Sequence, residues 1–187
     1  MIRGTGGPGR GPGFPRSGVA RLAMVLLIML TPTGAVGQSM ADDPFAAQVV
    51  GTWEGRGDYQ GNPLSLTRSW TTELLDQFLR ADMRVEMANG FTFGAFMYWR
   101  VVADGLYEVI WMDGQGRSQR LQATRDPDSG VVSSTFLDEL AEGGSEWRTW
   151  EFAATGPDAY VERLYEATAE GRELLAVFTF RRIASDS

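Results

Sequence analysis

Ten short segments of alternating polarity make up most of the chain after residue 48. Within them, apolar side chains recur at every second position, which is the period of a β-strand with one buried face. Turn pairs such as Asn89-Gly90 and Asp113-Gly114 separate many of the segments, and such pairs tolerate the positive φ that a tight hairpin needs. The segments cover residues 49–59, 64–73, 78–87, 91–102, 106–112, 118–125, 131–137, 146–153, 160–169 and 174–182.

Sequential strands joined by hairpins form a meander, and a meander this long hides its two edges best by closing into a barrel. We therefore predict an all-β fold, an antiparallel up-and-down barrel of about ten strands. The helix-like stretch at 42–50 is expected to cap one end of the barrel, and residues 137–141 to add a turn. A two-sheet sandwich is the alternative, but it usually needs long crossovers, and the gaps between these segments are short.

The first 37 residues have the pattern of an export signal. Four arginines and no acidic residue occur there, and the last of them directly precedes an apolar run at 22–30. This is the order of a charged n-region and an h-region. Nine apolar residues are too few for the roughly 20 that a membrane-spanning helix needs. We expect cleavage after Gly37 and a periplasmic or secreted protein with no stable membrane span, although a retained anchor is the alternative.

Cleavage would divide the chain into a signal peptide and a single barrel domain. A short N-terminal segment precedes the barrel, and a short tail follows it. The expected parts are 1–37 for the signal peptide, 38–48 for the N-terminal segment, 49–183 for the barrel and 184–187 for the tail.

Charge and composition exclude several functions. The net charge of −7 becomes −11 when the four leader arginines are removed, and a chain this acidic repels nucleic acid. The chain has no Cys and no His, which excludes thiolate nucleophiles, disulfides, His-based triads and Cys/His zinc sites. We expect no catalytic residues, no metal and no cofactor.

Residues 51–57 read Gly-Thr-Trp-Glu-Gly-Arg-Gly. This stretch resembles the Gly-x-Trp that opens the first strand of lipocalin-like barrels. The fuller pattern is similar to nitrobindin-like proteins and to a family of bacterial lipocalin-like domains of unknown function, whose last strand ends much as residues 180–183 do here. The resemblance spans about 49–183. Nitrobindins hold haem iron through a His, which this chain lacks, so the resemblance does not carry haem binding over.

The lipocalin-like resemblance implies a structural role for the two ends of the barrel domain. An Arg of the last strand, Arg181 or Arg182, would stack over Trp53 and close one end of the barrel, a contact worth about 0.5 to 2 kcal/mol. We expect Gly51, Trp53 and both arginines to hold the fold rather than to contact a ligand.

Alternation also predicts which side chains point into the barrel. Leu64, Leu66 and Trp70 place Arg68 on the same inward face, where an unpaired charge would be very costly. Arg68 therefore needs either a bound anion or an internal carboxylate, for which Glu151, Glu162 and Glu166 are the candidates. In the last strand, the same alternation places Leu174, Ala176, Phe178 and Phe180 inside.

Met and aromatic side chains with few charges form a lining suited to an amphipathic small molecule. The residues expected to contact it are Arg68, Trp70, Met83, Met97, Trp99, Tyr107, Trp111, Trp150 and Phe178. We therefore expect an exported, non-enzymatic barrel that binds a small hydrophobic or amphipathic molecule, an acid if Arg68 anchors it. A hydrolase or isomerase of the same fold using Tyr and carboxylates is one alternative. A structural envelope protein whose barrel is filled by its own aromatics is another, and the sequence also leaves the ligand and the oligomeric state open.

Overall fold

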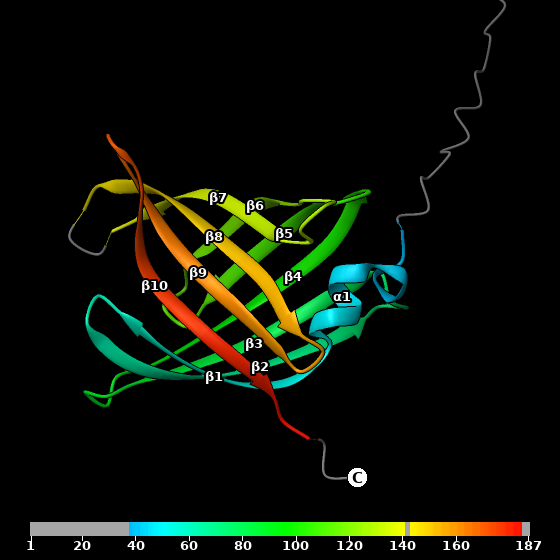
Figure 1. Ribbon diagram of the computed structural model, residues 1–187, viewed down its shortest axis with the longest axis horizontal. Helices are drawn as coiled ribbons and strands as arrows, with labels where there is room; N and C mark the ends of the chain where they lie inside the picture. Colours follow the sequence, from blue (N-terminus) through cyan, green and yellow to red (C-terminus); the bar gives the residue numbers. More distant parts are fainter. Residues whose placement is uncertain (1–37, 141–142, 185–187) are drawn as a thin grey trace, which may run out of the picture. The chain divides into compact units, whose positions relative to one another are not determined.

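The computed structural model describes residues 38–140 and 143–184, which form one closed antiparallel barrel (Figure 1). Each strand pairs with its neighbours in sequence, and the last strand pairs with the first. The strands are β1 (Gly51–Tyr59), β2 (Asn62–Glu73), β3 (Phe78–Met87), β4 (Thr92–Ala103), β5 (Leu106–Asp113), β6 (Ser118–Arg125), β7 (Val132–Glu139), β8 (Ser145–Gly156), β9 (Ala159–Thr168) and β10 (Gly171–Arg182).

This architecture confirms the predicted up-and-down barrel. The bounds of β3 and β6 match the predicted segments, and those of the other strands differ by a few residues at their ends. The turn expected to begin at Leu137 is wrong, because β7 continues through Glu139. The expected signal peptide at 1–37 lies outside the described residues, as do residues 185–187 of the tail.

A short helical segment caps one end of the barrel, as predicted (Figure 1). It consists of the 3-10 turn η1 (Met40–Asp42) and the helix α1 (Pro44–Val49). The Asp43 carboxylate accepts hydrogen bonds from the backbone N–H groups of Phe45 at 2.9 Å and Ala46 at 3.1 Å, so it acts as the N-cap of α1. Tyr107 of β5 donates its hydroxyl proton to the same carboxylate at 3.0 Å, which fixes the helix to the barrel wall.

Two glycines of β1 make room for aromatic rings of β10. A Cβ atom at Gly55 would collide with the ring of Phe180, and one at Gly57 would collide with the ring of Phe178 and the carbonyl of Val177. Both glycines lie on the inward face of β1, so the rings occupy the space that side chains at these positions would take. The close approach of β1 and β10 at the point of barrel closure therefore depends on glycine.

One predicted orientation in β10 is wrong. Leu174 is 50% exposed, although alternation with Ala176 places it inside. The register of β10 against β9 shifts between Leu174 and Ala176, which marks a β-bulge. A bulge adds one residue to a strand and interrupts its alternation, so the inward set of β10 begins only at Ala176.

The β6–β7 ladder is much shorter than the others. Its register contains only Thr124 opposite Ser133 and Arg125 opposite Val132. Within the described strands, each of the other nine ladders contains at least seven register pairs. The barrel wall is therefore joined at one end of β6 and β7 and lacks backbone pairing along the rest of their length.

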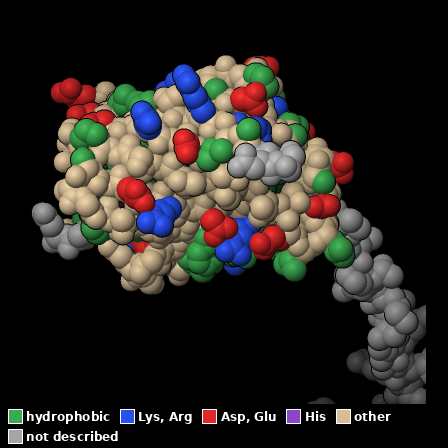
Figure 2. Space-filling view, turned by 90° about the horizontal axis from the view of Figure 1, so that it is seen from below, with side chains coloured by type: hydrophobic (Ala, Val, Ile, Leu, Met, Phe, Trp, Pro, Cys, Tyr) green, Lys and Arg blue, Asp and Glu red, His purple; other side chains and the backbone are tan. Residues whose placement is uncertain are grey.

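The face of the barrel seen in Figure 2 carries charges of both signs. Figure 2 shows acidic, basic and apolar side chains interspersed over one face of the barrel. Outward positions of β1 such as Thr52, Glu54, Arg56 and Asp58 are exposed, so the period-two pattern in the sequence matches the two faces of the wall.

Candidate functional site

The half of the interior next to α1 is filled with aromatic side chains. Phe45 of α1 projects into this end, and the ring centroids of four barrel residues lie 5.1 to 5.8 Å from its own. All five rings are buried. The four partners are Trp70, Trp99, Tyr107 and Phe152. This half of the barrel is therefore a packed core.

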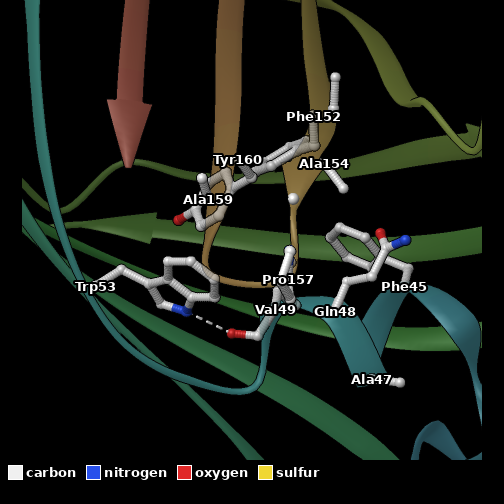
Figure 3. Close-up of a pocket in the computed structure, with 12 residues that line it drawn as sticks. Phe45, Ala47, Gln48, Val49, Trp53, Phe152, Ala154, Pro157, Ala159 and Tyr160 are labelled. Atoms are coloured by element: carbon white, nitrogen blue, oxygen red, sulfur yellow. Dashed lines mark hydrogen bonds between the residues drawn. The ribbon is translucent and has the colours of Figure 1, made fainter. Parts of the chain in front are cut away.

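A pocket of about 380 Å³ lies at the capped end, between α1 and the β8–β9 hairpin (Figure 3). Trp53, Tyr160 and Pro157 of the hairpin turn are among the residues that line it. The Trp53 indole N–H donates to the carbonyl of Val49 at 2.7 Å, so its only polar atom is already bonded. The pocket lies within the size range of small-molecule sites, roughly 300 to 1,000 Å³, but it offers no charged group.

Arg68 and Glu162 form a fully buried ion pair across the middle of the barrel. Arg68 Nη1 donates to Glu162 Oε1, and both side chains are 0% exposed. Arg68 Nη2 lies 2.8 Å from the Met83 sulfur, and Trp150 Nε1 donates to Glu162 Oε2 at 3.1 Å. Of the two partners considered for Arg68, the structure shows the internal carboxylate.

Aromatic rings enclose the Arg68 guanidinium. Its central carbon lies 5.2 to 5.8 Å from four ring centroids, those of Trp70, Trp150, Phe152 and Phe180. Cation–π attraction and the carboxylate together compensate for lost hydration. Burial raises the pKa of Glu162 to about 7, and the lowering effects of Arg68 and the Trp150 N–H do not offset this. Any acidic ligand at Arg68 would have to displace Glu162.

The half of the interior away from α1 presents apolar side chains that solvent can reach. Five strands in a row, β4 to β8, each place one partly exposed apolar residue on the inner face. Unlike the rings around Phe45, none of the five is fully buried. We call this set the inner apolar surface, and it consists of Phe93, Trp111, Leu121, Phe136 and Trp150.

Arg148 extends across part of the interior, beside the inner apolar surface. Its Nη1 donates to the Tyr59 hydroxyl at 3.1 Å. Because β9 and β10 separate β8 from β1 in the sheet, this bond spans part of the interior. The guanidinium also pairs with Asp138 at 3.2 Å and Glu146 at 3.4 Å, and the side chain is only 7% exposed. Two carboxylates thus compensate for its charge.

The structure divides the nine predicted ligand-contacting residues into three groups. Met83, Trp111 and Trp150 are partly exposed. Arg68 and Phe178 are buried, Arg68 against Glu162 and Phe178 beside Gly57. The remaining four belong to the packed end: Trp70, Met97, Trp99 and Tyr107.

The sequence interpretation did not select Phe93, Leu121, Phe136 or Arg148 as site residues. Their inward orientation follows from alternation within their strands, so the signal was present in the sequence. Which inward residues stay accessible depends on where Phe45 enters the barrel, and that is a tertiary feature.

The residues expected to be structural lie at the capped end. The guanidinium carbon of Arg182 lies 4.2 Å from the Trp53 ring centroid, whereas Arg181 is exposed. Arg182 also donates to the carbonyls of Val50 and Gln48. Gly51 has a φ of +129°, and a Cβ there would collide with the Arg182 guanidinium.

The described residues contain no group of three or more Asp or Glu side chains placed to hold a metal ion. Among the helices of residues 38–140 and 143–184, none has the length and apolar character needed to cross a membrane.

Comparisons with known proteins identify a fold but no family. No protein-family model matches the chain, and no curated protein matches it. Among solved structures, it is similar to Rv2717c from M. tuberculosis, with 15% identity over 74% of this chain and 94% of that chain and a TM-score of 0.54. A de novo designed fluorescence-activating β-barrel aligns with 16% identity over 74% of this chain and 97% of that chain, at a TM-score of 0.42. The first similarity supports the fold alone, a closed antiparallel barrel.

Proposed function

We propose that the protein binds a small hydrophobic or amphipathic molecule on the inner apolar surface of the barrel. The observation that carries this proposal is the accessibility of large apolar side chains on the inner faces of β4 to β8. Leaving Trp and Phe surface in contact with water inside a barrel is unfavourable by about 25 cal/mol per Å². A ligand that covers this surface recovers that free energy. The packed half around Phe45 leaves the other half as the binding region.

Trp111 provides the most direct test of this site. Trp111→Ala is expected to weaken binding of the neutral probe N-phenyl-1-naphthylamine about tenfold, which corresponds to about 1.4 kcal/mol. The reason is that Trp111, the β5 residue of the inner apolar surface, has a large apolar ring that a ligand would cover. Fluorescence titration of the purified protein measures the affinity.

Trp147→Ala is the matched control, because Trp147 is 55% exposed and lies on the outward-facing positions of β8. Its loss should leave the affinity for the probe unchanged. Equal affinity losses in both variants would contradict the proposed site. Absence of binding to the unmodified protein would favour a structural barrel filled by its own side chains.

Export to the periplasm or the medium forms part of the proposal, and its support is the sequence at 1–37. The order of arginines, apolar run and small residues before Gln38 is that of a cleavable signal. We expect the protein recovered from extracytoplasmic fractions of its host to begin near Gln38 or Asp42. N-terminal sequencing that reads from Met1 would overturn export with cleavage.

A further inference from the structure

The unpaired part of the β6–β7 boundary lies beside the inner apolar surface. We call this boundary the seam, comprising residues 118–123 of β6 and 134–139 of β7, which lack register partners across it. Two side chains bridge it in place of a ladder. Ser134 Oγ donates to the carbonyl of Gln122 at 2.8 Å, and Gln119 Nε2 donates to the carbonyl of Leu137. The seam is therefore held by contacts that separate more easily than a continuous ladder.

The seam lies within the inner apolar surface, and partly exposed inward residues such as Met83 of β3 and Leu164 of β9 continue the apolar lining on both sides. Leu121 of β6 and Phe136 of β7 lie on its two sides, with Trp111 on β5 and Trp150 on β8 next to them. Continuing the register of Thr124 and Ser133 places Leu121 opposite Phe136. An apolar group on the inner surface would thus lie directly behind the seam.

The seam is bridged by uncharged polar groups. Its bridging side chains are an amide and a hydroxyl, and its edges offer backbone N–H and C=O groups outside the ladder. These groups supply both donors and acceptors. On the inner side of the seam the charged side chain is Asp138, which pairs with Arg148. Arg120 and Glu139 lie on outward positions, where Arg120 pairs with Glu108 at 3.3 Å.

We propose that the seam is the head-group site and the passage for the ligand, and that this ligand is an amphipath with an uncharged hydrogen-bonding head, such as an alcohol or an amide. The inference rests on the proposed function and adds to it the ligand class and the route. A carboxylate or ammonium head on the inner side of the seam would lose hydration without gaining a free counter-charge, because Asp138 and Arg148 already pair there. An uncharged head exchanges hydrogen bonds with water for hydrogen bonds with the seam.

The ligand class is tested with three probes that share a naphthyl-octyl tail and differ in the head group. We expect the alcohol to bind the unmodified protein at least tenfold more tightly than the carboxylate or the trimethylammonium compound, measured by quenching of Trp fluorescence. Tighter binding of either charged probe would overturn the ligand class. If none of the three binds, the proposed function itself fails.

The route is tested with an engineered disulfide, which is unambiguous because the chain contains no other Cys. Arg120→Cys with Leu137→Cys places two outward thiols across the unpaired seam. The matched control is Thr124→Cys with Ser133→Cys, which links residues that are already register partners. Mass spectrometry establishes that each disulfide has formed, and stopped-flow fluorescence follows the alcohol probe.

We expect oxidation of the 120/137 pair to slow association and dissociation of the alcohol at least tenfold, and reduction to restore both rates. The 124/133 pair should bind at the rates of the unmodified protein in either redox state. Unchanged rates in the oxidised 120/137 protein would overturn the seam as the passage, while the binding site on the inner surface would still stand.

Discussion

Arg68→Met is expected to lower the free energy of unfolding by about 1 to 2.5 kcal/mol at about pH 8, because it leaves the Glu162 carboxyl buried without its partner. Both side chains are 0% exposed in the pair. Trp150 supplies one hydrogen bond to Glu162, which does not neutralise the charge. The variant should therefore unfold at a clearly lower urea concentration.

The size of this loss should depend on pH, because burial raises the pKa of Glu162 to about 7 from its ordinary value of 4.5. Between these two values the folded state holds the proton more tightly than the unfolded state, so stability falls as the pH rises. Removing Arg68 removes an influence that lowers this pKa, and the fall extends to higher pH. At about pH 5 the carboxyl is protonated, and we expect the variant to lie within about 1 kcal/mol of the unmodified protein.

A double variant separates a stranded charge from lost packing. Arg68→Met combined with Glu162→Gln removes both charges, so we expect it to recover most of the stability lost at about pH 8. Urea denaturation of the single and double variants at both pH values measures the coupling. A loss in Arg68→Met that is equal at both pH values, and that the second substitution does not relieve, would contradict the ion-pair interpretation.

The barrel could be predicted from the sequence because its strands and turns are each marked by residues close together in the chain. Period-two alternation marks each strand, and pairs such as Asp113-Gly114 mark its turns. The same alternation placed Arg68 inside. It could not choose among Glu151, Glu162 and Glu166, because β1 and β10 lie between β2 and β9 in the sheet. The partner of Arg68 is decided by barrel closure and by the register of four strands.

The accessible part of the interior could not be predicted, because a short helix decides it. Phe45 fills the capped end from α1, a six-residue helix too short for periodicity to reveal its buried face. Trp99 and Trp111 both point inward, yet only Trp99 contacts Phe45. Sequence alternation predicts the same inward orientation for both. Tertiary packing makes Trp99 part of the core and leaves Trp111 accessible.

The seam and the bulge of β10 were missed for a related reason. The sequence of β6 places Leu121 and Ala123 at alternate positions. Nothing within it indicates that most of its residues lack register partners on β7. Similarly, Leu174 fits the alternation of Ala176 and Phe178 until one extra residue enters β10. Pairing between strands depends on two segments at once, whereas alternation describes each of them alone.

Trp53→Ala is expected to lower the free energy of unfolding by about 3 to 5 kcal/mol, as large-to-small changes in a core do. The ring is 1% exposed and makes three different contacts. Tyr160 packs against it edge-on at a centroid distance of 4.7 Å, Arg182 lies over its face, and its N–H bonds to Val49. The substitution would therefore remove the side-chain contacts of β1 with α1, β9 and β10 at the end where the barrel closes.

Two further variants divide that loss among its causes and a third serves as a control, each measured by urea denaturation. Trp53→Phe keeps a ring but removes the N–H, so we expect a loss of about 1 kcal/mol from the hydrogen bond to Val49. Arg182→Met removes the cation–π contact, worth about 0.5 to 2 kcal/mol, together with the hydrogen bonds to Val50 and Gln48. Trp147→Ala removes an exposed Trp of β8 and should change stability by no more than about 0.5 kcal/mol. If Trp53→Ala were as stable as Trp147→Ala, the capped end would not depend on Trp53, and the packing of Phe45 alone would have to hold it closed.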